Sequence, residues 1–434
     1  MYEQALKTFH RLPAFDRVDP HTLREESFDL SRFQRFLDQI GNPEKGLPVI
    51  HIAGSKGKGS TAALIGSGLQ ALGKRVGVFI SPYLQHPTEA IFVDGKAMKP
   101  EIFSSFMDRY LPVIERLPRE NFITSFELLT AMALQYFHEV DVDFAVMETG
   151  LGGRLDATNS IESPLVSVIC PIEKEHTELL GNSLTSIAYE KLGIVREDTP
   201  VIIAPQHDPF ISDFAKTVAA QKKAPCLSVS GRYESTINER SGQAYRFRLK
   251  TPSRDISSIS LGLLGDHQVD NAMTAWAVLD YLMPDFNPLA VSAVWEHLSL
   301  PGRFETTTIE EREWILDGAH TPQSAKALRK TLDQIYGGKP MTFVLAFLND
   351  KDVEGVLREL IRWGDSVVVT QVDHPRALPA RVVEQRMKHF THSDQIVFAI
   401  TNTLFIAQQK AHKMSANNPI CATGSFKLVE ALRS

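Results

Sequence analysis

The chain has 434 residues, 43% of them hydrophobic and 23% charged, with a formal net charge of −6 at pH 7. This length exceeds what a single hydrophobic core usually serves, the composition is that of a globular protein, and the negative charge argues against a nucleic-acid partner. We see no apolar run of membrane-spanning length, no signal peptide and no paired cysteine spacing, so we expect a cytoplasmic protein without membrane association.

The N-terminal residues 1–45 are predicted to be helical. Apolar residues recur there at three- and four-residue spacings, and the stretch Gly41-Asn42-Pro43 then ends the pattern.

A phosphate-binding loop is predicted next. The apolar stretch Val49–Ala53 predicts a strand, the glycine- and lysine-rich stretch 54–60 follows, and a helix is expected from Thr61 to Leu72. Glycines at a helix N-terminus let backbone N–H groups approach an anion, and the helix dipole and Lys58 add positive charge. The spacing differs from the standard P-loop, because only Ser55 and Lys56 precede the Gly-Lys pair. The pattern alone therefore leaves an ordinary glycine-rich turn as an alternative.

Alternating strand and helix patterns continue along the chain and predict a parallel sheet with crossover helices. In the first part of the chain we expect a strand at 75–80, a hairpin at Asp94-Gly95, helices at 100–117 and 125–139, strands at 144–148 and 165–170, a helix at 183–192 and a strand at 201–203. Residues 207–260 alternate between helix and short β segments, and a helix runs from about Leu264 to Tyr281.

Glu148 ends a buried strand and precedes a glycine-rich stretch. Ligands bind beyond the carboxyl ends of strands in open parallel sheets, so this carboxylate is a candidate for positioning a metal ion. A solvated acid at a strand end is the alternative.

A domain boundary is predicted at Ser299–Arg303. Beyond it, strands at 314–316, 341–345, 366–370, 395–400 and 420–422 alternate with helices. We therefore predict an α/β protein with two domains. The first, residues 1–299, has a P-loop-type, mostly parallel sheet flanked by helices, and the second, residues 300–434, is a smaller Rossmann-like α/β domain.

Several stretches together resemble the folylpolyglutamate synthase and dihydrofolate synthase family, a branch of the Mur ligases. They are spread over nearly the whole chain, at residues 53–61, 81–82, 148–159, 190–194, 301–305 and 317–320. The stretch Glu148–Asn159 is the most specific of them.

The resemblance implies an ATP-dependent ligase that joins L-glutamate to a carboxylate of dihydropteroate or a reduced folate. ATP would phosphorylate the carboxylate, and the glutamate amine would attack the acyl phosphate. The implied cofactors are ATP and Mg²⁺, with two magnesium sites. Phosphoryl transfer needs charge neutralised on the phosphate oxygens, which a lysine and Mg²⁺ provide.

Site residues carried over from the resemblance fall into four groups. The nucleotide contacts are Gly57, Lys58, Gly59, Ser60, Asn271, Arg303 and Asp317. The metal ligands are Ser81, Glu148 and His176. Lys58, Lys191 and His320 match catalytic residues, and Lys191 matches a lysine that the family carries as a carbamate. The pterin or folate acceptor would contact Thr124, Arg154, Leu155, Asp156 and Ala157.

The departures from the family pattern concern mainly the acceptor. Ala90 stands where the family has arginine, Tyr83 replaces a histidine, Lys56 stands where bacterial members have asparagine, and Glu175 replaces an aspartate. A Mur-type ligase with a different carboxylate acceptor is therefore the alternative, and a nucleotide-binding module without ligase activity is a third reading. The sequence does not decide whether the enzyme has one or both of the dihydrofolate synthase and folylpolyglutamate synthase activities, nor how long a glutamate chain it makes. We expect a monomer.

Overall fold

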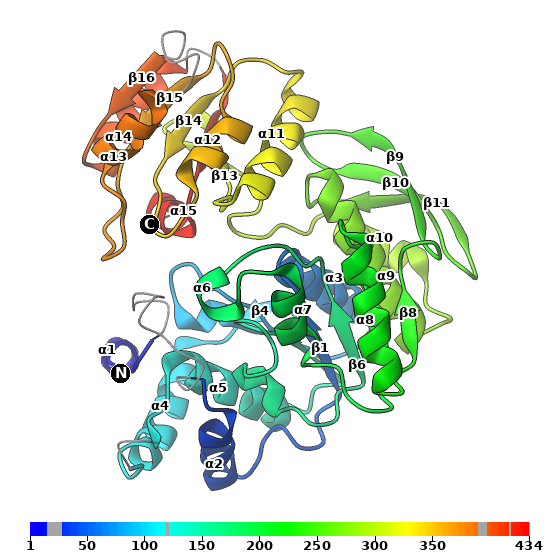
Figure 1. Cartoon of the computed structure of the whole chain (residues 1–434). Helices are drawn as coiled ribbons and strands as arrows, with labels where there is room; N and C mark the ends of the chain where they lie inside the picture. The colour runs from blue at the N-terminus through cyan, green and yellow to red at the C-terminus, as the bar shows by residue number, and fades with distance from the viewer. Residues whose placement is uncertain (15–27, 119–120, 389–396, 416–417, 434) are drawn as a thin grey trace. The chain divides into compact units, whose positions relative to one another are not determined.

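The computed structural model describes residues 1–14, 28–118, 121–388, 397–415 and 418–433 (Figure 1). Residues 15–27, part of the region predicted as helical, therefore lie outside the described residues. The chain folds as two compact units. The first contains Met1–Thr236, Arg248–Ile259 and Gln268–Trp295, and the second contains Ile237–Phe247, Ser260–His267 and Glu296–Ser434. The division into domains 1–299 and 300–434 stays a prediction.

The first unit is built on an eight-stranded sheet. Its order is β4 (Lys96–Ala97), β3 (Ile91–Val93), β2 (Val76–Phe79), β5 (Phe144–Glu148), β1 (Val49–Ala53), β6 (Val166–Ile169), β7 (Val201–Ile203) and β8 (Cys226–Ser228). The six strands β2, β5, β1, β6, β7 and β8 pair in parallel in this order. At the β2 edge, β3 and β4 add an antiparallel hairpin. The carboxyl ends of β1, β2, β5 and β6 therefore meet at one edge of the sheet.

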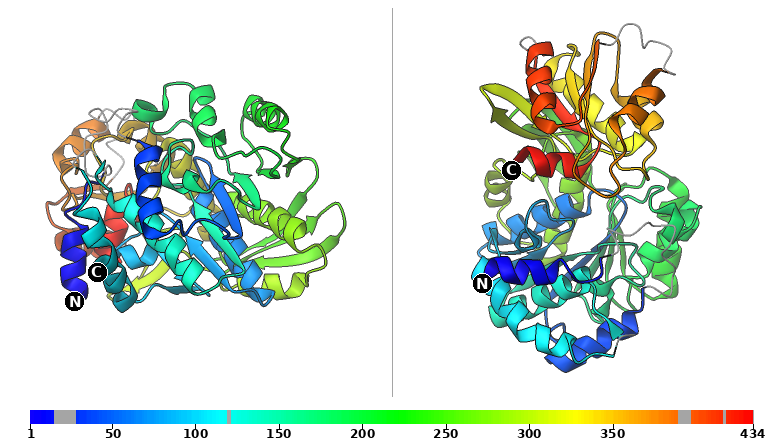
Figure 2. Two further views of the ribbon diagram at one scale, coloured as in Figure 1. Left: turned by 90° about the horizontal axis from the view of Figure 1, so that it is seen from below. Right: turned by 90° about the vertical axis from the view of Figure 1, so that its left-hand side faces the viewer.

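Helices of the first unit flank this sheet. They are α1 (Tyr2–Phe9), α2 (Leu30–Ile40), α3 (Lys58–Ala71), α4 (Pro100–Ile114), α5 (Ser125–Glu139), α6 (Thr177–Leu180), α7 (Leu184–Leu192), α8 (Pro209–Gln221), α9 (Asp266–Leu282) and α10 (Pro288–Trp295). Figure 2 shows α1, in dark blue, beside the cyan helix α4, where Tyr2 and Phe9 pack edge-on against Phe103 with ring centres 5.7 and 5.6 Å apart. None of the helices in the described part of the chain is long and apolar enough to cross a membrane.

Local sequence signals explain where several helices begin. Thr124 caps α5, because its hydroxyl accepts a hydrogen bond from the N–H of Glu127 while that glutamate accepts one from the N–H of Thr124. Asp29 caps α2 through the N–H of Ser31, and Gly41 ends that helix in the left-handed conformation.

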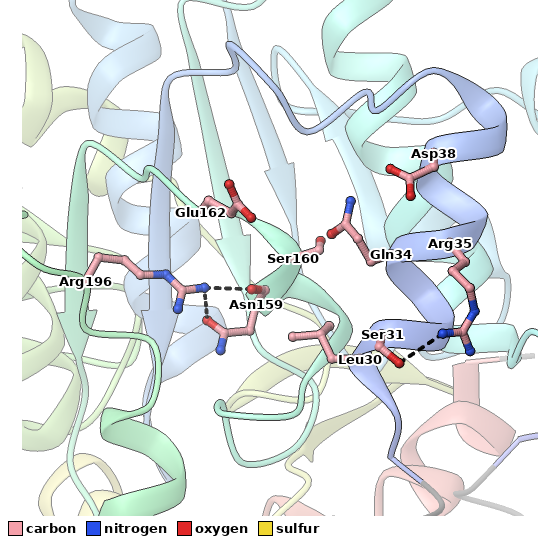
Figure 3. Close-up of a pocket in the computed structure, with 9 residues that line it drawn as sticks. All are labelled: Leu30, Ser31, Gln34, Arg35, Asp38, Asn159, Ser160, Glu162 and Arg196. Carbon is pink, nitrogen blue, oxygen red and sulfur yellow. Dashed lines mark hydrogen bonds between the residues drawn. The ribbon is translucent and has the colours of Figure 1, made fainter.

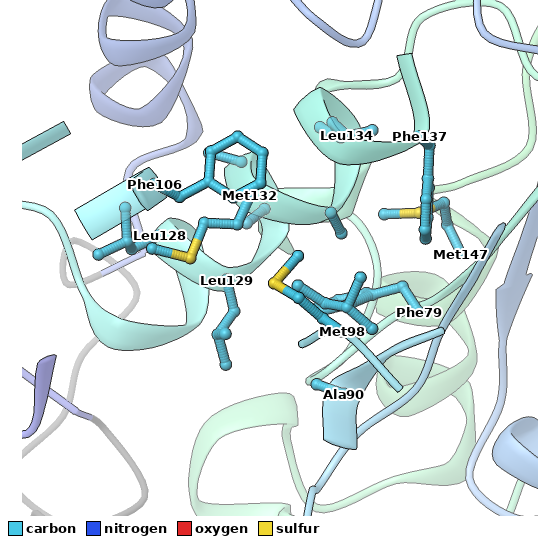
Figure 4. Packing of buried hydrophobic residues seen from close by; sticks show 14 of the residues in the cluster. Phe79, Ala90, Met98, Phe106, Leu128, Leu129, Met132, Leu134, Phe137 and Met147 are labelled. Carbon is cyan, nitrogen blue, oxygen red and sulfur yellow. The ribbon is translucent and has the colours of Figure 1, made fainter. Parts of the chain in front are cut away.

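A buried apolar cluster fills the space between the sheet and the helices α1, α2, α4 and α5. Figure 4 shows part of this cluster, including Phe79, Ala90, Met98 and Phe137. Ala90 is only 1% exposed, so the position at which the chain departs from the family pattern is part of the hydrophobic core here. An arginine with the same backbone would place a charge in an apolar environment, which is costly without a partner.

A three-stranded sheet in the order β11 (Asp255–Leu261), β10 (Tyr245–Lys250) and β9 (Glu234–Arg240) follows β8 in the sequence. In β10, buried and exposed residues alternate, as in a strand with one covered face.

The second unit contains a six-stranded sheet. Its order is β12 (Glu305–Ile309), β13 (Arg312–Leu316), β17 (Ile420–Thr423), β14 (Thr342–Leu345), β15 (Ser366–Val369) and β16 (Val397–Ile400). All its strands are parallel except β12, which pairs antiparallel with β13. The helices are α11 (Pro322–Tyr336), α12 (Val353–Leu360), α13 (Ala380–Lys388), α14 (Leu404–Met414) and α15 (Phe426–Arg433). The predicted fold class, two α/β sheets of which the first is the larger, is confirmed.

Candidate active site

The phosphate loop joins β1 to the N-terminus of α3. The helix begins at Lys58, three residues before the predicted start at Thr61, so Lys58, Gly59 and Ser60 form its first turn. Their N–H groups have no acceptor four residues back within the helix, and they give this end an affinity for anions. Gly57 is left-handed with φ +80°, and a Cβ there would lie 2.2 Å from Oδ1 of Asn271 on α9. The close approach of Asn271 therefore requires glycine at this position.

The segment after β6 fixes the other side of the loop. The carbonyl oxygen of Pro171 accepts hydrogen bonds from the N–H groups of Ser55 and Lys56, at 2.8 and 3.1 Å. The hydroxyl of Ser55 donates to the carbonyl of Glu173 at 2.9 Å. These bonds hold the loop in one conformation without using the first-turn N–H groups of α3.

Glu148 lies at the carboxyl end of β5 and is 3% exposed. Its Oε2 accepts a hydrogen bond from the N–H of Ser81 at 3.0 Å, and its Oε1 lies 3.9 Å from Nζ of Lys58. Ser81 follows β2, which pairs with β5, so sheet topology alone explains why these residues meet. The structure thus brings Lys58, Ser81 and Glu148 together.

His176 begins α6 and is exposed. Its φ is +47°, a left-handed conformation that is uncommon for a residue other than glycine and that is found often at functional sites. Its charge acts on the neighbouring Glu175.

Glu175 contacts two lysines. Nζ of the buried Lys191 on α7 donates to Oε1 of Glu175 at 2.8 Å and to the carbonyl oxygen of Gly54 at 2.9 Å. Nζ of Lys56 lies 3.8 Å from Oε2 of the same carboxylate. Burial opposes ionisation of Glu175, but Lys191, Lys58 and Lys56 together lower its pKa to about 2. Burial lowers the pKa of Lys191 to about 8, although Glu175 acts in the opposite direction.

Among the described residues, no group of three or more histidine, cysteine, aspartate or glutamate side chains could hold a metal ion. The predicted set contains two such residues and a serine, and Mg²⁺ usually keeps several waters and takes few protein ligands. A buried carboxylate beside a phosphate loop suits such a site, so Glu148 and Ser81 fit Mg²⁺. The metal set Ser81, Glu148 and His176 stays a prediction.

Residues predicted to contact the acceptor have structural partners. Thr124 is buried as the cap of α5, and its partner Glu127 forms a 2.7 Å ion pair with the buried Arg32 of α2. Arg154 pairs with Glu190 on α7 at 3.0 Å.

Asp156 begins a short 3₁₀ helix, Ala157–Ser160. Burial raises its pKa, while hydrogen bonds from Thr158 and Leu151 act in the opposite direction. Leu155 precedes Asp156 in the sequence, and Ala157, which follows Asp156, is buried.

A cavity of about 570 Å³ lies between α2 and this 3₁₀ helix (Figure 3). Arg196 on its wall donates to the backbone and side-chain oxygens of Asn159 at 2.7 and 2.8 Å. Of the predicted acceptor residues, none lines this cavity. Its lining residues are Leu30, Ser31, Gln34, Arg35, Asp38, Asn159, Ser160, Glu162 and Arg196.

In the second unit, Asp317 and His320 follow β13. Asp317 accepts hydrogen bonds from the N–H groups of Phe304 and Ala319, each at 2.8 Å, and desolvation raises its pKa. Nδ1 of His320 lies 2.7 Å from the carbonyl oxygen of Gly318, so Nδ1 carries a proton and donates it to this oxygen. The guanidinium of Arg303 lies 4.2 Å from the ring centre of Phe426 on α15.

Sequence reasoning missed two residues that organise the first unit. His51 lies in β1 and Arg196 follows α7, and neither was assigned a role. The signal for His51 was available, because it is the one polar residue in an otherwise apolar buried strand.

Comparisons with known proteins show to which family the chain belongs. Residues 52–279 match the family model of the Mur ligase middle domain, and residues 301–433 match that of the dihydrofolate synthetase C-terminal domain. The chain is 32% identical over 364 residues to a dihydrofolate synthase/folylpolyglutamate synthase of Bacillus subtilis, covering 81% of this chain and 83% of the relative.

Two solved structures are similar over the whole chain. A Mycobacterium tuberculosis folylpolyglutamate synthase complexed with ADP has a TM-score of 0.88 at 30% identity, covering all of this chain and 97% of the other. An Escherichia coli FolC in complex with DHPP and ADP has a TM-score of 0.82 at 25% identity, covering 100% and 96%.

Proposed function

This chain belongs to the dihydrofolate synthase and folylpolyglutamate synthase family of Mur ligases, and on that premise we propose how its residues carry out the reaction of that family. The reaction is ATP-dependent amide-bond formation between L-glutamate and a carboxylate of a pteroate or folate. The observation that supports it most directly is the contact between the phosphate loop and the buried carboxylate of Glu148, through Lys58 at 3.9 Å.

Lys58 neutralises charge on the phosphates of ATP as the γ-phosphoryl group moves to the acceptor carboxylate. The N–H groups of Gly59 and Ser60 at the start of α3 bind phosphate oxygens, and Asn271 beside Gly57 contacts the nucleotide. Arg303 and Asp317 are further proposed nucleotide contacts. His320 is proposed to act near the transferred phosphate.

Ser81, Glu148 and His176 would hold Mg²⁺. When bound, the ion neutralises charge on the phosphate oxygens of ATP. The N–H of Ser81 fixes the orientation of the Glu148 carboxylate, and Lys58 balances its charge.

Lys191 is proposed to carry a carbamate, formed when its neutral amine attacks CO₂ and loses a proton. Two observations support this. Burial lowers the pKa of Lys191 to about 8, so about one amine in ten is neutral at pH 7. Lys56 and Lys58 also act on Lys191, and these cations would stabilise the negative charge that the carbamate adds. The carbamate would require Glu175 to release its present hydrogen bond, and it would allow a second magnesium site.

Thr124, Arg154, Leu155, Asp156 and Ala157 are the proposed acceptor contacts. The internal bonds of Thr124 and Asp156 suggest that backbone shape, held by these side chains, contributes to that site. A monomeric state and a cytoplasmic location are also proposed.

ADP release tests the proposal. It is measured with ATP, Mg²⁺ and L-glutamate, with dihydropteroate or tetrahydrofolate present or absent. Turnover that requires both glutamate and a pterin compound supports the proposed reaction, and the preferred acceptor separates the two activities. ADP release with neither would indicate a nucleotide-binding module, and turnover that requires glutamate and another carboxylate would indicate a different Mur-type acceptor.

A further inference from the structure

A histidine lies in the centre of the first unit's sheet. His51 is the middle residue of β1, is 0% exposed, and lies in register with Met147 of β5 and Ser167 of β6. Burial lowers the pKa of this imidazole to about 3, so the ring is neutral. A buried imidazole is costly unless its polar atoms are hydrogen-bonded, so its partners indicate its role.

His51 has one described partner, the side chain of Thr158. Nε2 of His51 lies 2.8 Å from the hydroxyl oxygen of Thr158, and this hydroxyl lies 2.6 Å from Oδ1 of Asp156. Oδ1 also accepts from the N–H of Thr158 at 3.0 Å, while Oδ2 accepts from the N–H of Leu151 at 2.8 Å. The strand that leads to the phosphate loop is thereby joined to the loop that carries the proposed acceptor residues.

The direction of these bonds follows from their donors. The Thr158 hydroxyl has one hydrogen and gives it to the Asp156 carboxylate, so His51 must donate from Nε2. Its Nδ1 is then an acceptor, buried and without a hydrogen-bond partner in the described part of the chain. The fold therefore tolerates one unpaired nitrogen in its core in order to supply a single hydrogen bond to Thr158.

Other contacts hold the same loop but leave Thr158 untouched. Arg196 donates to two oxygens of Asn159 (Figure 3). It also donates to the carbonyl of Ile161, and Asn159 donates to the carbonyl of Arg154 at 2.9 Å. These bonds restrain the loop on both sides of Thr158. Thr158 holds Oδ1 of the Asp156 carboxylate, while backbone N–H groups of the same loop, including that of Leu151, act on the carboxylate as well.

We infer that His51 is a positioning residue for the acceptor: through the Thr158 hydroxyl it orients Asp156 and holds residues 151–158 in the shape that binds the pteroate or folate. This inference rests on the proposed function. It predicts that breaking the His51–Thr158–Asp156 chain weakens acceptor binding, while the phosphate loop, formed by other residues of the first unit, is retained.

The test compares four single variants of the full chain. Thr158→Val removes the hydroxyl with little change of shape, Thr158→Ser keeps it, and His51→Phe removes the donor. Ser167→Ala is the matched control, because Ser167 is equally buried in the adjacent strand and bonds to the carbonyl of Ile194 at 3.0 Å, not to the loop.

Steady-state kinetics with dihydropteroate or tetrahydrofolate give the first readout. We expect Thr158→Val and His51→Phe each to raise the KM for the acceptor about tenfold, while the KM for ATP stays within twofold of wild type. Thr158→Ser, which keeps the hydroxyl, should leave the acceptor KM close to the wild-type value. The double variant His51→Phe/Thr158→Val should be no worse than the single variants, since both break one chain. An acceptor KM within twofold of wild type in Thr158→Val, or an equal rise for ATP and acceptor, would overturn the inference. If His51→Phe does not fold, Thr158→Val alone decides.

Amide hydrogen exchange in the ligand-free protein gives the second readout, which does not depend on activity. Faster exchange at Leu151 and Thr158 in Thr158→Val than in Ser167→Ala supports the inference, and equal exchange overturns it. Wild-type protein without pterin-dependent turnover would refute the proposed function instead, and the exchange measurement would then still decide whether His51 orders the loop.

Discussion

Nζ of Lys191 lies 2.8 Å from Oε1 of Glu175 and 2.9 Å from the carbonyl oxygen of Gly54. One buried lysine on α7 therefore joins the phosphate loop to the segment that carries His176. Its ammonium group is destabilised by burial and stabilised by a single carboxylate, which suits a residue whose amine has to react.

Replacing Lys191 tests its proposed carbamate. Lys191→Ala should lower the rate of ADP formation by about 100-fold or more, a loss of the size seen when one group that stabilises transition-state charge is removed from an active site. Acetate at high concentration should restore part of the activity, because a small carboxylate can occupy the vacated position. Lys58→Ala is the control, since acetate cannot replace a cation there. Near-wild-type rates in Lys191→Ala would show that the lysine is structural.

Gly57 should tolerate no side chain. In Gly57→Ala the new Cβ would lie 2.2 Å from Oδ1 of Asn271 in addition to the strain of φ +80°, so we expect ATP affinity to fall at least tenfold. Gly337 provides the matched control, because it is also left-handed with φ +68° but has no atom within 4 Å of the added Cβ. Gly337→Ala should cost only about 1–2 kcal/mol of stability and leave ATP binding intact. Calorimetric titration with a non-hydrolysable ATP analogue measures the affinity of both variants. Equal affinities would contradict the proposed role of Gly57.

The buried ion pair of Arg32 and Glu127 should contribute strongly to stability. Arg32→Met leaves a buried carboxylate without its 2.7 Å partner, so we expect a loss of about 3–5 kcal/mol in the free energy of unfolding. Arg109 and Glu139 form an exposed pair, and Arg109→Met should cost about 0–1 kcal/mol. Urea denaturation gives the free energy of unfolding of both variants. An equally small loss of stability in both would show that water or a shift of Glu127 compensates for the missing Arg32.

His51 should also make stability depend on pH. Its pKa is about 3 in the folded chain and about 6.5 when unfolded, so the unfolded chain binds more protons between these values. Stability should therefore fall as the pH decreases below 6.5, by up to about 1.4 kcal/mol per pH unit. Arg196 acts in the same direction as burial.

Urea denaturation between pH 5.5 and 6.5 measures this effect, because the contribution of Glu175 falls mainly between its folded pKa of about 2 and its ordinary value of 4.5. His51→Asn should reduce the slope without removing it, because burial also lowers the pKa of His267, to about 4. Thr158→Val, which keeps the buried His51 imidazole, should retain the full slope. An unchanged slope in His51→Asn would show that other groups dominate.

Much of the fold follows from local sequence patterns. The ranges predicted for α5, β5 and β7 agree with the structure, because caps and apolar runs define their ends. The start of α3 was placed three residues late, because glycine and lysine at a helix N-terminus resemble a loop in sequence. The pairing of β12 with β13 and the three-stranded sheet were not foreseen, since short strands with many exposed residues give a weak alternation signal.

The candidate site was only partly predictable. Glu148 follows from the rule that ligand residues gather at strand ends, Lys58 from the glycine–lysine loop, and Ser81 from the family resemblance, and the structure brings the three together. The contacts of Lys191 with Gly54 and of His51 with Thr158 join positions more than 100 residues apart, and spacing in one sequence carries no signal for such pairs.

The edges of the large sheet have a consequence for the behaviour of the protein at high concentration. One edge is β4, with two residues that include Lys96, and the other is β8, with three residues. Such short edges offer few unpaired N–H and C=O groups on which a strand of another molecule could add, and a lysine there makes pairing still less favourable. The sheet that positions the phosphate loop is thus a poor template for intermolecular strand pairing, and concentrated samples should resist aggregation through these edges.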